Sequence, residues 1–548
     1  MSVTNTKASS VDKIIATLLK NRGINTKKEK EEFFNPSDPN KIDSKEFGVD
    51  EKELTKAVMR IKKAIEKKEK IIVWGDYDVD GICATAILWE TLHFGQASSL
   101  PYIPSRFNEG YGLNEESIKK LKDENENLGL IITVDHGITA HEKIKFAKKL
   151  GIDIIVVDHH EPLKAKLPAA AVVHTQEISG SGVAWVLARE LGKSQNIPTD
   201  HIGLAALGTV ADVLPLVGHN RSIVVYGLRE LRKSNRPGLV SLCSEAAINQ
   251  RELGTYHIGY VVGPRLNSMG RVEHAMDSLR LICTRSPGRA TELASKIGKT
   301  NKVRQEKTQF ALGHVNESYG SGWSNGSLPK LIFVHHESYE EGVIGIVAGK
   351  LVDQYHRPSI VASRGEEVSK ASARSISGVN IVDTIRKAGG KMLVSVGGHP
   401  MAAGFTVKTK DIEALSKKLS DIASREITDK MVVRSTRVDC ELSLSEVSDE
   451  LYAEIVKFAP FGFGNPEPAF KTDRVKVEEA RLVGKDNDHL KMVLSSSAVF
   501  PAIAFGMGEV YPKLKQDALV NLVYSIKQNE WNGRRKLELG IKDIKLSD

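Results

Sequence analysis

From Lys70 to Ala211, short runs rich in Ile and Val alternate with segments of helical periodicity. The runs are IIVW, LGLIITV, IDIIVV and AAVV, and the helical segments include GICATAILWETLHF and TAHEKIKFAKKLG. Continuous apolar runs of this length, separated by helices, are typical of a parallel sheet that is buried on both faces. Ligands of such sheets bind outside the carboxyl ends of the strands. The alternation therefore limits this region to an α/β fold and predicts where its functional residues lie.

Acidic and histidine side chains follow the apolar segments in four short motifs. In chain order, the motifs GDYDVDG, ITVDHG, VVDHHEP and GTVADVLPL contain Asp76, Asp78, Asp80, Asp135, His136, Asp158, His159, His160 and Asp212. So many carboxylates repel one another and are costly to desolvate unless a cation neutralises them. Carboxylate with imidazole suits a divalent ion such as Mn²⁺ or Mg²⁺. The sequence therefore predicts a metal cluster at one edge of the sheet.

Composition excludes several other classes of protein. The chain has 548 residues, which is too long for one core and suggests about three or four domains. No apolar stretch approaches the roughly 20 residues of a membrane span, and the first residues contain no secretory signal. The four cysteines form no CxxC pair, which fits a reducing compartment, so we expect a cytoplasmic protein. A net charge of +8 around acidic motifs suits a polyanionic substrate.

The pattern of elements predicts five regions along the chain. Residues 1–69 are expected to be helical, with one amphipathic helix that covers the next domain. A parallel α/β domain at 70–220 is followed by a helical connector at 221–327, which ends in a Gly- and Ser-rich linker at 318–329. A second α/β domain occupies 328–430. Short alternating strands at 431–548 predict a small all-β barrel, for which an oligonucleotide-binding (OB) fold is the first candidate.

Several motifs allow a family resemblance to be stated. The four acidic motifs resemble, in order, those of the DHH phosphoesterase superfamily, and GGHPMAAGF resembles the glycine-rich motif of the associated DHHA1 domain. YIPSRFNEGYG, GPRLNSMGR and PFGFGNPEP resemble signatures of the bacterial-type RecJ branch, the single-strand-specific DNA exonucleases. The resemblance runs from about residue 45 to the end. It implies that 70–220 is a DHH domain and that 328–430 is a DHHA1 domain.

Phosphodiester hydrolysis with two metals needs two divalent ions roughly 3.5 to 4 Å apart, with a carboxylate between them. The resemblance implies that Asp135 is this bridge. It assigns Asp80, His159 and Asp212 to one ion and Asp78 to the other. The division of the ligands between the two ions is not fixed by the sequence. Asp135 is therefore expected to be a catalytic residue.

Three further residues of the acidic motifs have less definite roles. Asp158 is expected to be a metal ligand. Asp76 is either a direct ligand or a carboxylate behind the ligands. The resemblance implies that His160 faces the substrate and donates a hydrogen bond or a proton to the scissile phosphate, so we expect it to be catalytic.

Arginines and glycines outside the acidic motifs predict contacts to the substrate. Arg106, Arg265 and Arg271 lie among glycines that let a phosphate approach the backbone, although surface ion pairs are the alternative. The resemblance implies that Arg106 and Arg271 hold the phosphate at the 5′ end of a strand. It implies further nucleotide contacts from Ser372, Arg374, Ser375, Gly397, Gly398 and His399. In the barrel, Trp531 in QNEWNGRRK is the best candidate to stack on a base, since most other barrel aromatics are expected in the core.

The resemblance implies a function. It predicts an Mn²⁺- or Mg²⁺-dependent exonuclease that releases 5′-mononucleotides from the 5′ end of single-stranded DNA in repair and recombination. A single-strand-binding protein and a helicase are the implied partners, and we expect a monomer. One alternative is another DHH phosphoesterase that acts on nano-RNA, small nucleotides or pyrophosphate, but such enzymes do not need the barrel. The other is a non-catalytic replication scaffold, but its acidic motifs would be degraded.

Overall fold

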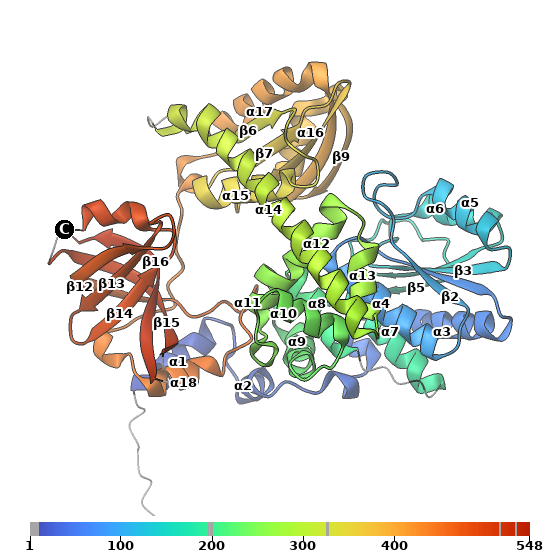
Figure 1. Cartoon of the computed structure of the whole chain (residues 1–548), viewed down its shortest axis with the longest axis horizontal. Coiled ribbons are helices and arrows are strands. Elements are labelled where there is room, and N and C mark those ends of the chain that lie inside the picture. The colour runs from blue at the N-terminus through green and yellow to red at the C-terminus, as the bar shows by residue number, and fades with distance from the viewer. Residues whose placement is uncertain are drawn as a thin grey trace, which may run out of the picture.

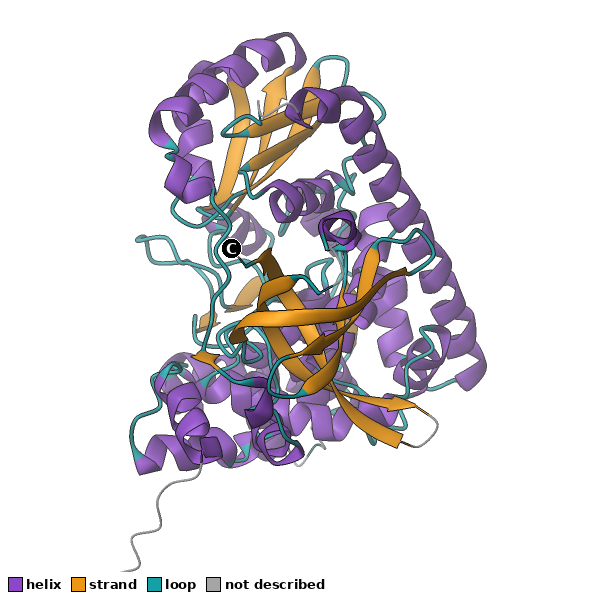
Figure 2. Ribbon diagram, turned by 90° about the vertical axis from the view of Figure 1, so that its left-hand side faces the viewer, coloured by secondary structure: helices purple, strands orange, loops and turns teal. Residues whose placement is uncertain are grey.

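The computed structural model describes residues 10–195, 197, 201–324, 328–514, 517–531 and 534–547. Three sheets form the centres of three lobes, and one long helix leads from the first lobe to the second (Figure 1). The third lobe, a barrel, lies to the left of the other two in Figure 1 and faces the viewer in Figure 2. Among the residues described, no helix is long and apolar enough to cross a membrane.

The first lobe contains the parallel sheet that the alternating pattern predicts. Its strands have the order β2-β1-β3-β4-β5 and all pair in parallel. They are β1 (Lys70–Trp74), β2 (Ser99–Tyr102), β3 (Leu128–Val134), β4 (Asp153–Asp158) and β5 (Ala171–His174). Ile71 and Val73 of β1 pack into one core, whereas Ile72 and Trp74 pack into another on the opposite face. Both faces are therefore buried, and the predicted α/β fold is confirmed.

Helices cover both faces of this sheet. They are α3 (Glu51–Glu66), α4 (Val79–Phe94), α5 (Glu115–Glu124), α6 (His141–Lys149), α7 (Gly180–Gln195) and α8 (Ile202–Ala211). The expected amphipathic helix is α3, which begins at the N-cap Asp50 and buries Leu54 and Ile61 against the sheet core. The helices α4 and α8 matter most for function, because each carries acidic residues at one end.

Residues 10–34 pack on a different part of the chain. The helices α1 (Ser10–Lys20) and α2 (Lys27–Phe34) bury Ile14, Leu18 and Phe33 in the core of the C-terminal barrel. Residues 1–69 were expected to form one helical region, but the described part of this region is divided between two cores. The pattern of apolar residues predicts an amphipathic helix but does not identify the surface that it covers.

The connector is helical, as expected, but it ends differently. It contains α9 (Gly218–Leu231), α10 (Pro237–Glu245), α11 (Thr255–His257), a π-helical turn (Ile258–Val262), α12 (Gly263–Val272), α13 (Met276–Cys283) and α14 (Pro287–Ser324). The predicted linker at 318–329 is wrong over 318–324, where α14 continues. Trp323 stacks on Tyr319 and contacts Tyr355 of the second lobe, with ring centroids 5.8 and 5.2 Å apart. This packing offsets the weak helix propensity of Gly and Ser.

The second lobe contains a mixed sheet of strand order β6-β7-β8-β10-β9. Its strands are β6 (Ile332–His336), β7 (Ser359–Ser363), β8 (Val368–Arg374), β9 (Leu393–His399) and β10 (Ala402–Lys408). The helices α15 (Ile344–Tyr355), α16 (Ile381–Gly389) and α17 (Ile412–Glu426) pack on it. β9 is one of the two edge strands, and it presents the glycine-rich GGH segment to solvent.

The third lobe is a closed barrel, so the expected barrel is confirmed. Pairing of β12 with β15 closes the sheet β11-β12-β13-β14-β16-β15. Its strands are β11 (Cys440–Glu441), β12 (Phe470–Val483), β13 (His489–Ser495), β14 (Val499–Ala504), β15 (Leu519–Trp531) and β16 (Arg534–Leu546). The helix α18 (Asp449–Val456) and α1 contribute to the core of the barrel.

A buried arginine joins the barrel to the first lobe. Arg221 of α9 donates hydrogen bonds to the carbonyl oxygens of Phe33, Phe458 and Ala459, at 2.8, 3.1 and 2.8 Å. Its guanidinium lies 3.9 Å from the ring centroid of Phe33. Burial lowers the pKa of Arg221 to about 10. Arg221 therefore links α9 both to the N-terminal helices and to the segment that leads into the barrel.

A second buried network links α4, α8 and the connector. Glu90 of α4 accepts a hydrogen bond from His201 Nε2 at 3.0 Å and two from Arg236, at 2.6 and 2.9 Å. Burial opposes ionisation of Glu90, but the hydrogen bonds from His201 and Arg236 outweigh it and lower its pKa to about 2. The network fixes two helices that carry acidic motifs.

We expect Glu90→Gln to lower the free energy of unfolding by about 3 kcal/mol at neutral pH. The folded pKa lies below the ordinary value, so the contribution of Glu90 is fully present above a pH of about 4.5 and is lost as the pH falls toward about 2. Denaturant titrations of the wild type and of Glu90→Gln across this pH range would measure the difference in the free energy of unfolding. Glu142→Gln, in the exposed ion pair with Lys145, is the control and should have little effect. Equal stability losses at neutral pH in the two variants would contradict the expectation.

Candidate metal centre and adjoining anion pocket

The acidic motifs meet at the carboxyl edge of the first sheet. Asp76 and Asp78 follow β1, Asp135 follows β3, and His159 follows β4. Asp80 lies in the first turn of α4, and Asp212 caps the C-terminus of α8. Parallel strands present their carboxyl ends at the same edge, so residues far apart in sequence become neighbours.

Three sets of side chains place ligand atoms within 4.8 Å of one another. The sets are Asp76, Asp78 and Asp135; Asp80, His159 and Asp212; and Asp135, His159 and His160. His159 Nε2 lies 3.2 Å from Asp135 Oδ1, 3.6 Å from Asp212 Oδ2 and 3.9 Å from Asp80 Oδ2. Asp135 belongs to two sets and therefore lies between the two groups of carboxylates.

Backbone amides hold Asp80 in place. Its carboxylate accepts hydrogen bonds from the amides of Gly180 and Ser181, at 2.7 and 3.0 Å. Both amides lie at the start of α7, where unpaired donors and the helix dipole favour a negative charge. A Cβ at Gly208 of α8 would collide with Asp80 Oδ1. Glycine at this position therefore lets α8 approach the carboxylate.

Asp135 has the features of a metal ligand. Its φ of 64° is in the left-handed region, which is uncommon for a residue other than glycine and occurs often at functional sites. Asp135 Oδ1 is buried and makes no hydrogen bond among the described residues, although His159 Nε2 lies 3.2 Å away. Burial, followed by repulsion from Asp80 and Asp78, raises the pKa of Asp135 well above its usual value. A divalent ion would satisfy the oxygen and neutralise the repulsion, so these residues fit the predicted metals.

Asp158 and His160 form a separate pair at the end of β4. Asp158 accepts hydrogen bonds from the amides of Ile138, His159 and His160, and from His160 Nδ1 at 2.7 Å. Burial opposes ionisation of Asp158, but His160 outweighs it and lowers the pKa to about 2. Asp158 was expected to be a direct ligand, and that stays a prediction. In the structure, its carboxylate orients His160 and the following loop.

We expect Gly208→Ala to lower hydrolysis by at least about a hundredfold, because displacing a catalytic carboxylate by 1 Å costs about this much. The new methyl group would collide with Asp80 Oδ1 and with Ser181 Oγ. Initial rates at saturating Mn²⁺ would measure the loss. Gly313→Ala is the matched control, because this glycine is also helical and its Cβ position has no atom within 4 Å. Similar rates in both variants would show that the approach of α8 to Asp80 is not required.

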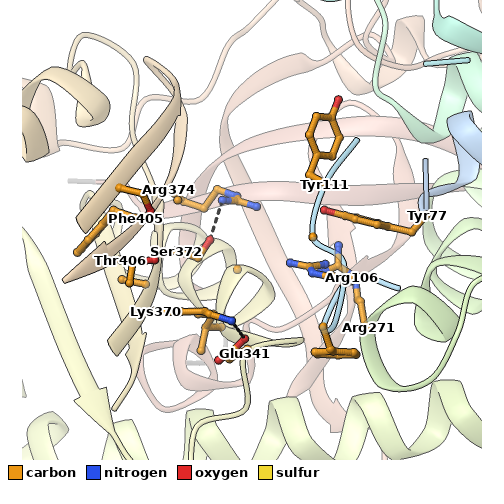
Figure 3. Close-up of a pocket in the computed structure, with 17 residues that line it drawn as sticks. Tyr77, Arg106, Tyr111, Arg271, Glu341, Lys370, Ser372, Arg374, Phe405 and Thr406 are labelled. Atoms are coloured by element: carbon orange, nitrogen blue, oxygen red, sulfur yellow. Dashed lines mark hydrogen bonds and ion pairs between the residues drawn. The ribbon is translucent and has the colours of Figure 1, made fainter. Parts of the chain in front are cut away.

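A pocket of about 360 Å³ adjoins the metal centre, between the first and second lobes. Figure 3 shows Tyr77, Arg106, Tyr111 and Arg271 on one side, facing Ser372, Arg374, Phe405 and Thr406 across the cavity. Lys370 and Glu341 also line it and pair with each other at 2.8 Å. Tyr77 lies between Asp76 and Asp78 in sequence, so the pocket and the metal centre share the loop after β1.

The arginines of this pocket have no carboxylate partners among the described residues. Arg106 lies over the ring of Tyr77 at 5.2 Å, and Arg271 donates to the carbonyl oxygen of Gly342 at 3.2 Å. Arg374 donates to Ser372 Oγ at 3.2 Å. Burial, followed by repulsion from Arg106 and two further arginines, lowers the pKa of Arg271 to about 10. Several cations held together in this way form a site for an anion such as phosphate.

Other predicted contacts lie elsewhere. Arg265 pairs with Glu245 at 2.8 Å and does not line the pocket, so the surface ion pair that we considered applies to it. Ser375 is buried and donates to the carbonyl oxygen of Val379. Gly397, Gly398 and His399 lie on the exposed edge strand β9. The side chain of Trp531 lies outside the part of the chain that the structure describes.

Three pocket residues that we did not predict have recognisable signals in the sequence. Tyr77 stands inside the first acidic motif. Lys370, Ser372 and Arg374 alternate along β8, so the period of two places Lys370 on the same face as the two predicted residues. Tyr111 lies in the same glycine-rich motif as Arg106.

Comparison with known families matches three consecutive parts of the chain. Residues 70–209 match the DHH family N-terminal domain, 328–425 match the DHHA1 domain, and 438–543 match the RecJ OB domain. The three matches fall on the three lobes.

Individual relatives match over nearly the full length. The single-stranded-DNA-specific exonuclease RecJ of Bacillus subtilis is 35% identical over 99% of this chain and 69% of its own length. The protein of the same name from Haemophilus influenzae is 31% identical over 90% of this chain and 91% of its own. The crystal structure of RecJ from Thermus thermophilus in complex with Mn²⁺ superimposes with a TM-score of 0.83 at 27% identity, covering 98% of this chain and 76% of that one. A structure of the same protein with Mg²⁺ also matches, with a TM-score of 0.76.

Proposed function

The chain belongs to the RecJ family of single-stranded-DNA-specific exonucleases, and on this premise we propose that it removes 5′-mononucleotides from the 5′ end of single-stranded DNA. The main support for the proposal is that the acidic cluster adjoins the arginine-lined anion pocket: Tyr77, which lines the pocket, stands between Asp76 and Asp78 of the cluster. A terminal phosphate in the pocket would leave the next phosphodiester beside the carboxylates. This arrangement favours cleavage from a phosphorylated end.

The proposed ligands follow the sets of neighbouring side chains. Asp80, His159 and Asp212 would hold one ion, Asp78 the other, and Asp135 both, with Asp76 beside Asp78. Bound Mn²⁺ or Mg²⁺ would supply an activated water and stabilise charge on the reacting oxygens.

The chain's own residues position the substrate. Arg106 and Arg271 would hold the terminal phosphate, while Ser372 and Arg374 would contact it or the neighbouring nucleotide from the opposite side. Asp158 fixes the ring of His160 through Nδ1 at 2.7 Å, which leaves Nε2 to donate to the scissile phosphate. The barrel would hold the more distant part of the strand.

Further features of the protein are proposed on the same premise. The domain boundaries 70–220, 221–327, 328–430 and 431–548 remain our proposal. We also propose a cytoplasmic monomer that acts in repair and recombination. A helicase would supply unwound DNA, and a single-strand-binding protein would present it.

One assay tests the activity. Single-stranded DNA, duplex DNA and short RNA, each labelled at the 5′ end, are incubated with Mn²⁺, with Mg²⁺ or with chelator. We expect early release of labelled mononucleotide from single-stranded DNA in the presence of metal only. Release of labelled fragments longer than a mononucleotide, or equal cleavage of duplex DNA, would contradict the proposal.

We expect Arg106→Ala to abolish the preference for 5′-phosphorylated over 5′-hydroxyl ends. Loss of a charge-assisted contact of about 1.5 to 3 kcal/mol corresponds to roughly a 10- to 150-fold fall in kcat/KM for the phosphorylated strand. Competition between the two kinds of end measures the preference. Arg265→Ala is the matched control, because this arginine is paired with Glu245 away from the pocket. Unchanged discrimination in Arg106→Ala would assign this arginine a structural role.

A further inference from the structure

The anion pocket contains one acidic side chain that the function described so far does not use. Glu341 is the one carboxylate among the described residues that line the pocket. Its Oε2 lies 2.8 Å from Nζ of Lys370, which is the one lysine of the described lining. Figure 3 shows this pair below Ser372 and Arg374 in the view. A carboxylate in an anion site repels the ligand, so we expect it to restrict which anions enter.

The loop between β6 and α15 fixes Glu341 at the pocket. On one side of Glu341, the side chain of Glu340 pairs with Lys307 of α14 at 2.6 Å. On the other side, the carbonyl oxygen of Gly342 accepts a hydrogen bond from Arg271 at 3.2 Å. A Cβ at Gly342 would lie 2.0 Å from the carbonyl oxygen of Arg271, so the two backbones are in close contact. The residues before and after Glu341 are therefore both attached to the connector.

A terminal phosphate finds donors in the lining without using Lys370. The arginines of the pocket have no carboxylate partners among the described residues, and the first turn of α15 adds backbone amides. Gly345 in this turn lines the pocket, and Val343 at the N-cap has no side-chain acceptor for the amides. Unpaired amides at a helix N-terminus favour a phosphate. A Cβ at Gly345 would lie 3.0 Å from Ser372 Oγ and 3.3 Å from Arg374 Nη2, so this turn adjoins the proposed phosphate contacts.

The charges of the pocket limit the charge of its ligand. A terminal monophosphate carries a charge of about −1.5 to −2 at neutral pH, and each further group of a triphosphate adds to this charge. Lys370 is the remaining cation of the described lining, but its ion pair with Glu341 neutralises it. In a cavity of about 360 Å³, the added phosphate groups would lie close to the carboxylate of Glu341. Like charges at such short distances repel strongly where water is partly excluded.

We propose that the pair of Glu341 and Lys370 restricts the anion pocket to a terminal monophosphate and excludes 5′-triphosphate ends. Such ends are those of chains that a polymerase starts from a nucleoside triphosphate. Glu341 repels the added phosphate groups and also prevents Lys370 from binding them. Discrimination of this kind needs a repulsive element as well as attractive contacts. The inference rests on the proposed function and adds to it the class of 5′ end that the enzyme rejects.

The competing interpretation is a surface ion pair without a role in recognition. The side chains of Lys370 and Glu341 are 49% and 41% exposed, and exposed pairs contribute little to stability. The same exposure makes the pair easy to test, because substitutions there are not expected to unfold the protein.

The test compares two strands of one DNA sequence, one with a 5′ monophosphate and one with a 5′ triphosphate, each labelled at the 3′ end. Mn²⁺ is kept in large excess over the strands, so that chelation by the triphosphate does not deplete it. In the wild type, we expect kcat/KM to be at least about tenfold lower for the triphosphate strand, which is the size of one charged contact. In Glu341→Gln, this ratio should shrink by about tenfold, because the repulsion is removed and Lys370 is freed.

Two further variants identify the cause of the change. Adding Lys370→Met to Glu341→Gln removes the freed cation, so discrimination should return in part. A double variant that discriminates no better than Glu341→Gln would overturn the role of Lys370. Glu340→Gln is the matched control, because this neighbouring glutamate is also in an ion pair but does not line the pocket, and it should keep the wild-type ratio. Circular dichroism compares the folds of all variants.

The outcomes separate this inference from the proposed function. Failure of the wild type to degrade the monophosphate strand overturns both. If the wild type degrades that strand, equal kcat/KM for the two kinds of end overturns the inference alone. Discrimination that is equally strong in the wild type and in Glu341→Gln also overturns it, because the exclusion would then come from the size of the cavity.

Discussion

Replacing Asp135 with asparagine should lower phosphodiester hydrolysis by at least about a thousandfold, which corresponds to about 4 kcal/mol of transition-state stabilisation. Asp135 is shared by two of the three sets of candidate ligands, and its buried Oδ1 makes no hydrogen bond among the described residues. An amide of the same shape keeps the packing but removes the charge that a divalent ion requires. Initial rates with Mn²⁺ on a 5′-phosphorylated strand measure the loss.

Thermal unfolding gives a second measure of the same substitution. Wild-type protein should unfold at a higher temperature when Mn²⁺ is added, because a ligand that binds only the folded state stabilises it. Asp135→Asn should lose most of this increase. Without metal, the variant should be at least as stable as the wild type, since one of several crowded carboxylates is neutralised. Asp153→Asn is the control, because Asp153 lies at the opposite end of β4 and pairs with Arg60. Wild-type hydrolysis in Asp135→Asn would refute the metal centre as described.

Replacing Arg221 with methionine should remove about 3 to 5 kcal/mol of the free energy that holds the barrel on the first lobe. The substitution leaves the carbonyl oxygens of Phe33 and Ala459 without the donor that Arg221 supplies, whereas that of Phe458 keeps a hydrogen bond from Asn465 Nδ2. The chain has several lobes, so the quantity to compare is the midpoint of the earliest unfolding transition in denaturant. Limited proteolysis should cut the segment before β12 sooner in the variant.

Arg229→Met is the matched control for this substitution. Arg229 is an exposed residue on the same helix, and its guanidinium lies over the ring of Tyr226 at 4.8 Å. Its loss should shift the transition by less than about 1 kcal/mol. Equal shifts in the two variants would mean that Arg221 does not connect the lobes.

The metal centre could be predicted from the sequence because strand ends and acidic residues coincide in it. The four apolar runs identify β1, β3, β4 and β5, although not the edge strand β2. A parallel sheet has one carboxyl edge, so the meeting of Asp78, Asp135 and His159 followed from the order of elements. The same reasoning could not show that Asp158 turns its carboxylate toward backbone amides, because side-chain direction at a strand end depends on the following loop.

The directions of the two arginines on α12 could not be predicted from the order of elements. Arg265 and Arg271 both lie on α12, six residues apart, and therefore point in directions that differ by about 120° around the helix. Helical periodicity does not show which direction faces the second lobe; the family resemblance assigned Arg271 to the terminal phosphate, and only Arg271 of the two lines the pocket. The extension of α14 into 318–324 also depends on a tertiary contact, between Trp323 and Tyr355.

The packing of α1 in the barrel core gives the chain a nearly circular path. Asn21 donates a hydrogen bond to the carbonyl oxygen of Asp439 at 2.8 Å, across 418 positions of sequence. A ribosome would make the apolar face of α1 well before its partner strands, so this face would stay uncovered while the two lobes between them are synthesised. A catalytic fragment freed of the barrel therefore needs two cuts, one before α3 and one near Lys430. A circular permutant that joins Leu546 to Ser10 by a flexible peptide and opens elsewhere would place the two partners next to each other in the order of synthesis.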